Sequence, residues 1–305
     1  MNLEECKNEF EWFLNVQYKD IDNLKDKIKE FCNNFCFDDL YDETKVNELF
    51  DKDLESKEKY YKLSYGSNSK DNKDGDDTTL ARIGYFLIHN DYNENKYTIP
   101  GLKSFDDLGS GYKYKYRGDT INTYSTLFGD SNQGRNKFFT SLEERNQIDY
   151  FRKKYQTFGN FIVFPAATAQ LDSNKRKWDS INTFRGINKH IRDFFDLTME
   201  SFIDGHEFDI LKHLPETKEY FDVMNNINKF IEINFLQDYF DKNNQVIKNK
   251  FNHPHPKTPY HWNFTDISET YEYRKFALNY ISEATKIIER RADKIYQILC
   301  YIYNV

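Results

Sequence analysis

The stretch FGNFIVFPAA, residues 158–167, decides the fold class of this chain. A compact apolar run that ends at a proline is typical of a buried β-strand, because proline has no N–H with which to continue a β-ladder. The segments on either side carry mostly helical patterns, so a strand here predicts an α+β fold. We expect a mostly helical α+β domain in which a small sheet is covered by long helices.

Two other segments are expected to complete the sheet. The run IGYFLI (83–88) is compact and apolar, and YKYKY (112–116) alternates tyrosine with lysine, a pattern typical of a strand. The predicted sheet is therefore built from segments near 83–88, 112–117 and 160–164. Between them, Ser141 followed by Glu144 forms a capping-box pattern and predicts a helix that continues to about Gln156.

A long helix is predicted over 182–204, within SINTFRGINKHIRDFFDLTMESFIDG (180–205). It is apolar around most of its circumference, and Asp193, Asp196 and Glu200 share the remaining narrow stripe. Such a helix is usually buried, and buried acids need partners or a wet cavity. The segment therefore predicts a polar pocket next to this helix.

The last helix is predicted over 266–302, with Asp266 and Glu269 as its cap. Its seam alternates spacings of four and three residues: Ala277, Ile281, Ala284, Ile288, Arg291, Ile295, Ile298 and Ile302. Such a repeat requires a long partner, either the N-terminal helices of the same chain or a second subunit. Because Arg291 interrupts the seam, we expect it to pair with a carboxylate of the same chain, which favours a monomer over a homodimer.

Three regions follow from the patterns along the chain. Residues 1–63 are predicted to be helical, since Ile21, Leu24, Ile28 and Phe31 recur at helical spacing. Residues 64–79 are polar and predict a flexible surface loop. Residues 80–305 are predicted to form the main α+β domain.

Charge and composition limit the classes of partner. The net charge is −7, so nothing supplies the basic surface that bulk nucleic-acid binding requires. No apolar run approaches the length of a membrane span, so we expect a cytoplasmic protein without a membrane partner. Four cysteines form no disulfide framework; Cys32 and Cys36, one helical turn apart, are either buried thiols or half of a metal site.

The segment YRGDTINTYSTLF (116–128) gathers Arg117, Asp119, Thr120 and Asn122 around a glycine. The planar fork of an arginine at a strand end can bond two oxygens of a phosphate or carboxylate. A Tyr-Arg-Gly strand also occurs in NAD-dependent ADP-ribosyltransferases, although the other motifs of that fold are only loosely echoed by Thr140–Glu144. The alternative is a turn fixed by hydrogen bonds from side chains to backbone.

Two more groups complete the candidate site. Gly159-Asn160 either pins a sharp turn or aims an amide into a pocket. Asn182 and Arg185 lie near a predicted helix N-terminus, which favours anions, and the acidic stripe follows. We take Asp193, Asp196 and Glu200 as candidate catalytic acids and bases. The candidate ligand-binding residues are Arg117, Asp119, Thr120, Asn122, Asn160, Asn182 and Arg185.

Alternatives to this site stay open. The same polar residues could form an internal salt-bridge network, and paired carboxylates could share a divalent cation. No metal ligand is assigned, and the sequence does not identify a cofactor. Arg185 and His190 match the R-x4-H pattern of metal-free HEPN-type ribonucleases, and His253, His255 and His261 are interpreted as part of an ordinary loop.

Several motifs in fixed order resemble an uncharacterised bacterial family that is often found in prophages and plasmids. They span about residues 80–292: GDTINTY, GNFIVFP, INTFRG, IRDFFDLTMESF, FLQDYF and YRKFALNYISEATKIIERR. Phe194 stands where that family usually has arginine. The resemblance implies no established activity, and it implies a role in phage–host conflict only by association.

Two functions of different classes remain. The favoured one is an enzyme or sensor with an internal pocket for a nucleotide-like ligand, including enzymes that act on nucleotides or NAD. The other is an interaction or inhibitor module whose polar motifs are structural and whose outer surface binds a protein.

Overall fold

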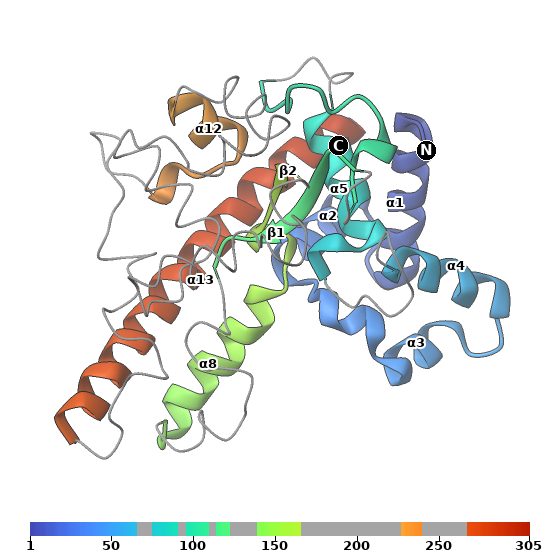
Figure 1. Ribbon diagram of the computed structural model, residues 1–305. Helices are drawn as coiled ribbons and strands as arrows, with labels where there is room; N and C mark the ends of the chain where they lie inside the picture. Colours follow the sequence, from blue (N-terminus) through green and yellow to red (C-terminus); the bar gives the residue numbers. More distant parts are fainter. Residues whose placement is uncertain (66–74, 91–95, 110–113, 123–138, 166–226, 240–266) are drawn as a thin grey trace, which may run out of the picture.

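The computed structural model describes residues 1–65, 75–90, 96–109, 114–122, 139–165, 227–239 and 267–305. Helices dominate this part of the chain, and Figure 1 shows them around a small central sheet. In chain order the α-helices, 3₁₀ helices (η) and strands are α1 (Leu3–Gln17), α2 (Leu24–Asn34), η1 (Phe37–Tyr41), α3 (Glu43–Phe50), α4 (Leu54–Ser64), η2 (Gly75–Asp77), α5 (Thr79–His89), η4 (Phe105–Asp107), β1 (Tyr116–Thr120), α8 (Leu142–Tyr155), η5 (Phe158–Asn160), β2 (Phe161–Pro165), α12 (Ile227–Ile233), η7 (Gln237–Tyr239) and α13 (Ile267–Tyr303).

The sheet consists of β1 and β2, which pair antiparallel from Tyr116 opposite Pro165 to Thr120 opposite Phe161. The strand predicted near 160–164 is therefore confirmed, as is the mostly helical α+β class. The strand predicted over 112–117 begins only at Tyr116 and continues to Thr120, with residues 112–113 outside the described part. β1 has these limits because its five residues pair one for one with the five residues of β2.

The prediction of a strand at 83–88 is wrong, because these residues lie within helix α5. Thr78 caps this helix by accepting a hydrogen bond from the Ala81 N–H, and every residue from Leu80 to His89 is buried. A helix that is buried on all sides shows no polar face, so a short apolar run does not distinguish it from a buried strand.

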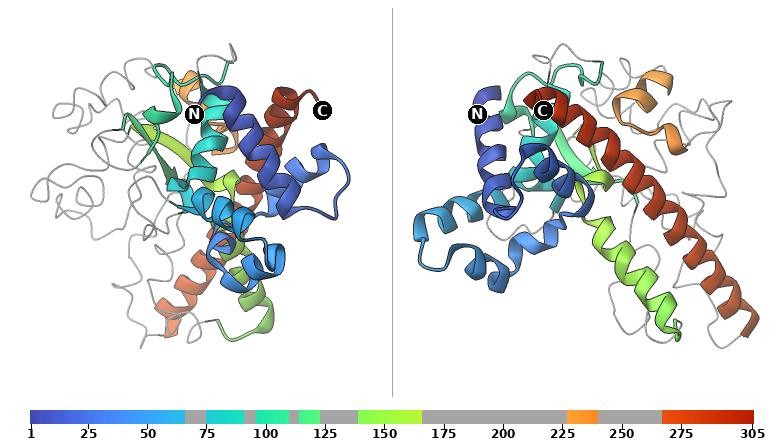
Figure 2. Two further views of the ribbon diagram at one scale, coloured as in Figure 1. Left: turned by 90° about the vertical axis from the view of Figure 1, so that its right-hand side faces the viewer. Right: turned by 180° about the vertical axis from the view of Figure 1, so that it is seen from behind.

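Helix α13 is a long helix that runs diagonally past the sheet (Figure 1; Figure 2, right). Toward its N-terminal end, Ala277, Ile281, Ala284 and Ile288 are buried in one cluster with side chains of α8. Toward its C-terminal end it packs on α2, and Tyr303 Oη donates to the Lys7 carbonyl at 2.8 Å. The C-terminal part of the seam thus packs on an N-terminal helix, as one of the two alternatives predicted, whereas its N-terminal part packs on α8, which neither alternative named.

The main core is aromatic and joins the N-terminal helices to the sheet. Four phenylalanine rings pack against one another at centroid distances of 4.9–6.4 Å: Phe31 from α2, Phe37 from η1, Phe158 from η5 and Phe161 from β2. Such aromatic pairs bury large apolar areas and prefer the edge-to-face and offset arrangements observed here. The core therefore fixes the position of β2 against the N-terminal half of the chain.

Local signals were reliable at several helix ends. Residues 1–63 are mainly helical, and the capping box of Ser141 and Glu144 is formed at the start of α8. The 64–79 segment differs from prediction at its end, because Gly75 to Thr78 are buried instead of lying on the surface. The predicted helix over 182–204 and the predicted cap at Asp266 lie outside the described residues.

Within the described ranges, no helix is both long and apolar enough to cross a membrane.

Candidate functional site

The sequence-predicted site residues divide into two groups. Arg117, Asp119, Thr120 and Asn122 lie on β1 and directly after it, and Asn160 immediately precedes β2. These five residues therefore come together at the sheet. The others lie outside the described residues: Asn182, Arg185, Asp193, Asp196, Glu200, His190 and the three histidines of the 252–261 segment.

An ion pair joins β1 to the segment that leads into α5. Arg117 Nη2 lies 3.5 Å from Asp77 Oδ2, and the two side chains are 19% and 3% exposed. Arg117 Nε also donates to the Gly118 carbonyl at 3.0 Å, which turns the guanidinium back along its own strand. A charge pair this far from solvent is weakly screened, so each partner depends on the other.

Asp76 is buried beside this pair and is held against β1 by its backbone. Its carbonyl oxygen accepts a hydrogen bond from Tyr85 Oη at 3.0 Å, and it also lies against Gly118. Burial raises the pKa of Tyr85, and the nearby carboxylates of Asp76, Asp77 and Asp119 raise it further. Three carboxylates and one phenol from η2, α5 and β1 therefore share one poorly solvated region.

Asn122 and Asn160 form a second, neutral polar link at the end of the sheet. Asn160 Oδ1 accepts from the Asn122 N–H at 2.9 Å and from Asn122 Nδ2 at 3.0 Å. Asn160 Nδ2 donates to the carbonyls of Asn122 and Tyr155, both at 2.9 Å. Both amide hydrogens and both acceptor positions of Asn160 are thus used within the protein. This geometry favours the structural alternative for Asn160 over a role in ligand binding.

The buried Arg291 fastens α13 to two other elements. Its Nε donates to the Asn234 carbonyl at 2.9 Å, just after α12, and its Nη1 donates to the Gly159 carbonyl at 2.7 Å. A cation near the C-terminal end of a helix is favoured by the carbonyls there. The expected partner was a carboxylate of the acidic stripe or of the N-terminal region; these two hydrogen bonds go to backbone carbonyls instead, and the acidic stripe lies outside the described residues.

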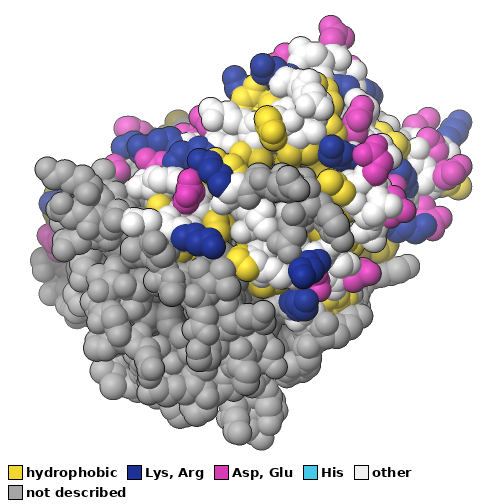
Figure 3. All heavy atoms as spheres, turned by 90° about the horizontal axis from the view of Figure 1, so that it is seen from above, with side chains coloured by type: hydrophobic (Ala, Val, Ile, Leu, Met, Phe, Trp, Pro, Cys, Tyr) yellow, Lys and Arg dark blue, Asp and Glu magenta, His cyan; other side chains and the backbone are white. Residues whose placement is uncertain are grey.

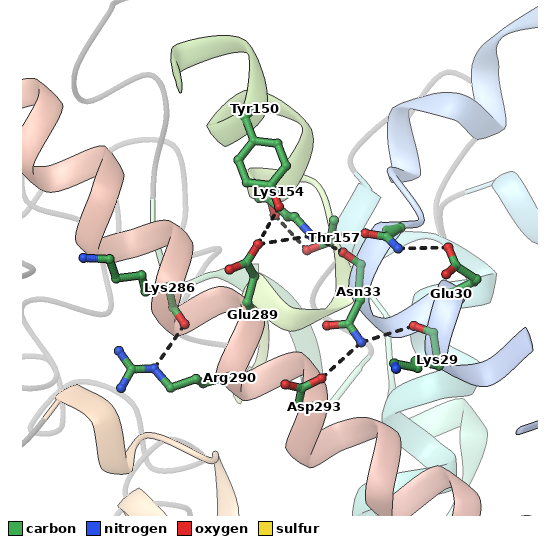
Figure 4. Close-up of polar contacts among 11 residues, drawn as sticks. Lys29, Glu30, Asn33, Tyr150, Lys154, Thr157, Lys286, Glu289, Arg290 and Asp293 are labelled. Carbon is green, nitrogen blue, oxygen red and sulfur yellow. Dashed lines mark hydrogen bonds and ion pairs between the residues drawn. The ribbon is translucent and has the colours of Figure 1, made fainter. Parts of the chain in front are cut away.

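A further polar cluster, which the sequence patterns did not indicate, joins α8, α13 and the end of α2 (Figure 4). Lys154 Nζ donates to the Asn33 carbonyl at 2.6 Å and lies 3.6 Å from Glu289. Tyr150 Oη donates to the same Glu289 at 2.5 Å, and this bond, together with burial, raises the pKa of Tyr150 to about 12. Lys154 thus supplies a charged hydrogen-bond donor to a carbonyl at the C-terminal end of α2, which is a structural role.

The cysteines are thiols. Burial raises the pKa of Cys36 to about 11 and that of Cys32 well above its ordinary value, which disfavours the thiolate form that binds metal. Among the described residues, no group of three or more histidine, cysteine, aspartate or glutamate side chains is placed to hold a metal ion.

Comparison with known families shows where this chain belongs. The model of a family of unknown function, DUF6994, matches residues 61–295, most of the chain. The chain belongs to this family. No curated protein and no solved structure matched. The match includes η2, α5, the sheet and most of α13, so the ion pair of Asp77 and Arg117 lies within the DUF6994 region.

Sequence reasoning missed three charged residues of the DUF6994 member at this place: Asp76, Asp77 and Arg82. All three are buried, at 3%, 2% and 7% exposed. Asp76 and Asp77 belong to a polar run that predicts a surface loop, and Arg82 precedes a run that predicts a strand. One signal was present: the threonine that follows the two acids is a typical helix N-cap.

The described surface carries no dominant single sign of charge on the face shown in Figure 3. Lysine and arginine side chains alternate there with aspartate and glutamate. The concentration of charge in the interior, between η2, α5 and β1, is therefore the more informative feature.

Proposed function

We propose that this protein binds a nucleotide-like small molecule at an internal polar site that includes Asp76, Asp77, Arg117 and Asp119. The supporting observation is the ion pair of the half-buried Arg117 with the buried Asp77, with a second buried carboxylate, Asp76, next to it. Buried charges are costly unless they are paired or serve a ligand, so they concentrate at functional sites.

The chemistry of the group suits such a ligand. Carboxylates accept hydrogen bonds from ribose hydroxyls and from exocyclic amines of bases, while an arginine fork binds phosphate oxygens. In this proposal Asn182 and Arg185 add donors for the phosphates, and Asp193, Asp196 and Glu200 supply acid–base chemistry. The role in phage–host conflict that the family resemblance implies would be the biological setting of this activity.

One observation favours the second candidate, an interaction module whose polar motifs are structural. The hydrogen bonds of Asn160 are all made within the protein, as a structural network requires. In that case no small molecule would bind at the sheet, and the partner would be a protein on the outer surface.

A thermal-shift screen separates the two candidates. NAD, nucleoside triphosphates and cyclic nucleotides are added separately, because a ligand that binds only the folded state must raise the Tm. On the first proposal at least one of them raises the Tm of the wild type. Unchanged melting with every compound, together with unchanged calorimetric traces, would remove the small-molecule proposal.

Two sets of variants then locate the site. Arg117→Lys keeps the charge but removes the fork, so the ligand-induced shift should shrink while the protein stays folded. Arg185→Ala and Glu200→Ala should abolish the response. Arg152→Lys, at an exposed position of α8, is the matched control and should behave as wild type. A full ligand response in all three site variants would exclude these residues from the site.

A further inference from the structure

Among the buried cations that the structure describes, Arg82 stands out because its Nε is shielded from solvent and has no hydrogen-bond partner. It lies in α5, four residues after the N-cap residue Thr78, and is only 7% exposed. By contrast, the buried Arg291 uses two of its nitrogens on backbone carbonyls.

The guanidinium of Arg82 lies over two aromatic rings. Its Cζ lies 4.5 Å from the centroid of Phe105 and 5.6 Å from that of Tyr114. Cation–π contacts stabilise a guanidinium through its flat faces, while its N–H donors point outward along its edge. Aromatic contact therefore stabilises the cation but supplies no oxygen acceptor for its Nε.

The charges near Arg82 do not supply that partner directly. Besides burial, the groups that act on the pKa of Arg82 are Tyr114, Asp77, Asp106 and Cys6. None of them forms an ion pair with Arg82 among the described residues. Burial lowers the pKa of Arg82, and these groups oppose the effect. Arginine stays protonated in proteins, so Arg82 remains a largely buried cation whose Nε has no hydrogen-bond acceptor.

We propose that Arg82 is an anion-binding residue whose guanidinium edge takes an oxyanion, a phosphate or carboxylate group of a small ligand. A planar guanidinium that aromatic contacts already hold in place suits the paired oxygens of such a group. This inference deepens the proposed function and rests on it for the rest of the ligand. Asp77 connects the two places, because it pairs with Arg117 and also acts electrostatically on Arg82.

The test measures anion binding without a nucleotide. Wild type, Arg82→Gln and Arg82→Lys are titrated with inorganic phosphate, pyrophosphate and acetate, in thermal-shift and calorimetric assays in an otherwise anion-poor buffer. Adenosine, which lacks a charged group, is the neutral arm. Arg152→Gln, at an exposed position, is the matched control.

We expect at least one oxyanion to raise the Tm of wild type and of Arg152→Gln. Arg82→Gln should weaken its affinity about tenfold or more, and Arg82→Lys should weaken it less. Without anion, Arg82→Gln should be at least as stable as wild type, because it removes an unsatisfied buried charge. Equal anion responses in wild type and Arg82→Gln, or no response in wild type, would overturn the inference. So would a marked loss of stability in Arg82→Gln, since that result means a purely structural cation.

Repeating the titrations with NAD and nucleoside triphosphates keeps the two proposals apart. Phosphate binding that depends on Arg82, without any response to nucleotides, supports the anion site and removes the nucleotide proposal. Nucleotide binding of equal strength in wild type and Arg82→Gln supports the nucleotide proposal and removes the role of Arg82.

Discussion

Gly118 and Asp76 come so close that a Cβ atom at position 118 would lie 2.0 Å from the Asp76 carbonyl oxygen. The same Cβ would also meet Tyr85 Oη at 2.7 Å, the group that donates to that carbonyl. The close packing of β1 on η2 thus depends on the absence of a side chain at residue 118. It is this contact that brings the two buried acids beside Arg117.

Gly118→Ala is therefore expected to destabilise the protein by about 2 kcal/mol or more, because backbone has to move and the hydrogen bond of Tyr85 is disturbed. Chemical denaturation monitored by circular dichroism measures the change. Gly101→Ala is the comparison: Gly101 has a φ of +83°, but its nearest neighbour would be 3.6 Å from the new Cβ. Its cost should be about 1 kcal/mol, the price of the backbone conformation alone. Equal stability of wild type and Gly118→Ala would contradict this packing.

Asn160→Asp tests the amide link at the end of the sheet. A carboxylate keeps the acceptor of Asn160 but replaces its Nδ2 donor with an oxygen that faces the carbonyl oxygens of Asn122 and Tyr155, so we expect a loss of about 3 kcal/mol or more. Asn15→Asp is the matched control, because that exposed side chain only accepts from Lys27 Nζ and a carboxylate still can. Urea denaturation of the two variants should separate them clearly. A mild effect of Asn160→Asp would mean that its donors are not needed, and it would return Asn160 to the ligand-binding set.

Because His89 is buried, we expect the protein to lose stability at mildly acidic pH. Burial lowers its pKa to about 4, and its Nδ1 bonds to the Tyr97 carbonyl at 2.8 Å. The unfolded chain takes up a proton near pH 6.5 and the folded chain only near pH 4. The stabilisation from neutral His89 is therefore present above about pH 6.5 and is lost as the pH falls toward 4, by about 3 kcal/mol in all.

Urea denaturation at pH 7 and pH 4.5 measures this effect. In His89→Gln the difference between the two pH values should be smaller than in wild type by most of that amount. If both proteins lose the same stability on acidification, then His89 is not the titrating group.

Ile288→Asp tests whether the seam of α13 is covered within one chain. Ile288 is 1% exposed and packs in a cluster with residues of α8, so a carboxylate there should cost about 4 kcal/mol or more. Tyr301→Asp, on the same helix but 78% exposed, should change stability by less than about 0.5 kcal/mol. Circular dichroism melts measure both changes. Sedimentation of the wild type is expected to show a monomer. A wild-type dimer, together with an Ile288→Asp variant that is folded but monomeric, would show that the seam faces a second copy of the chain.

Interactions that are local in sequence were predicted well. The capping box of Ser141 and Glu144, the strand that ends at Pro165 and the seam from Ala277 to Ile302 were all read from spacing and residue type. Each depends on contacts within a few residues, or on a period that repeats along one element. Such features are encoded where they occur.

The site was predicted only in part for the opposite reason. The sequence indicated Arg117 and Asn160 as polar residues at strand ends, but not their partners Asp77 and Asn122 in these pairings. Asp77 lies in a polar stretch that is typical of a surface loop, whereas in the structure its side chain is buried. Arg82 was overlooked because a fully buried helix and a buried strand have the same apolar pattern.

The sequence by itself determined the mostly helical α+β class, the second strand, the start of α8 and the apolar seam of α13, because local propensity and periodicity specify these features. Only the tertiary structure decided that 83–88 is helical, that Asp76 and Asp77 are buried and that Asn160 is a link between chain segments. The physical reason is that burial and hydrogen-bond partners are set by residues distant in sequence: Asn160 bonds to Asn122, and Arg291 bonds to Gly159. No pattern within either segment specifies which distant group will be its neighbour.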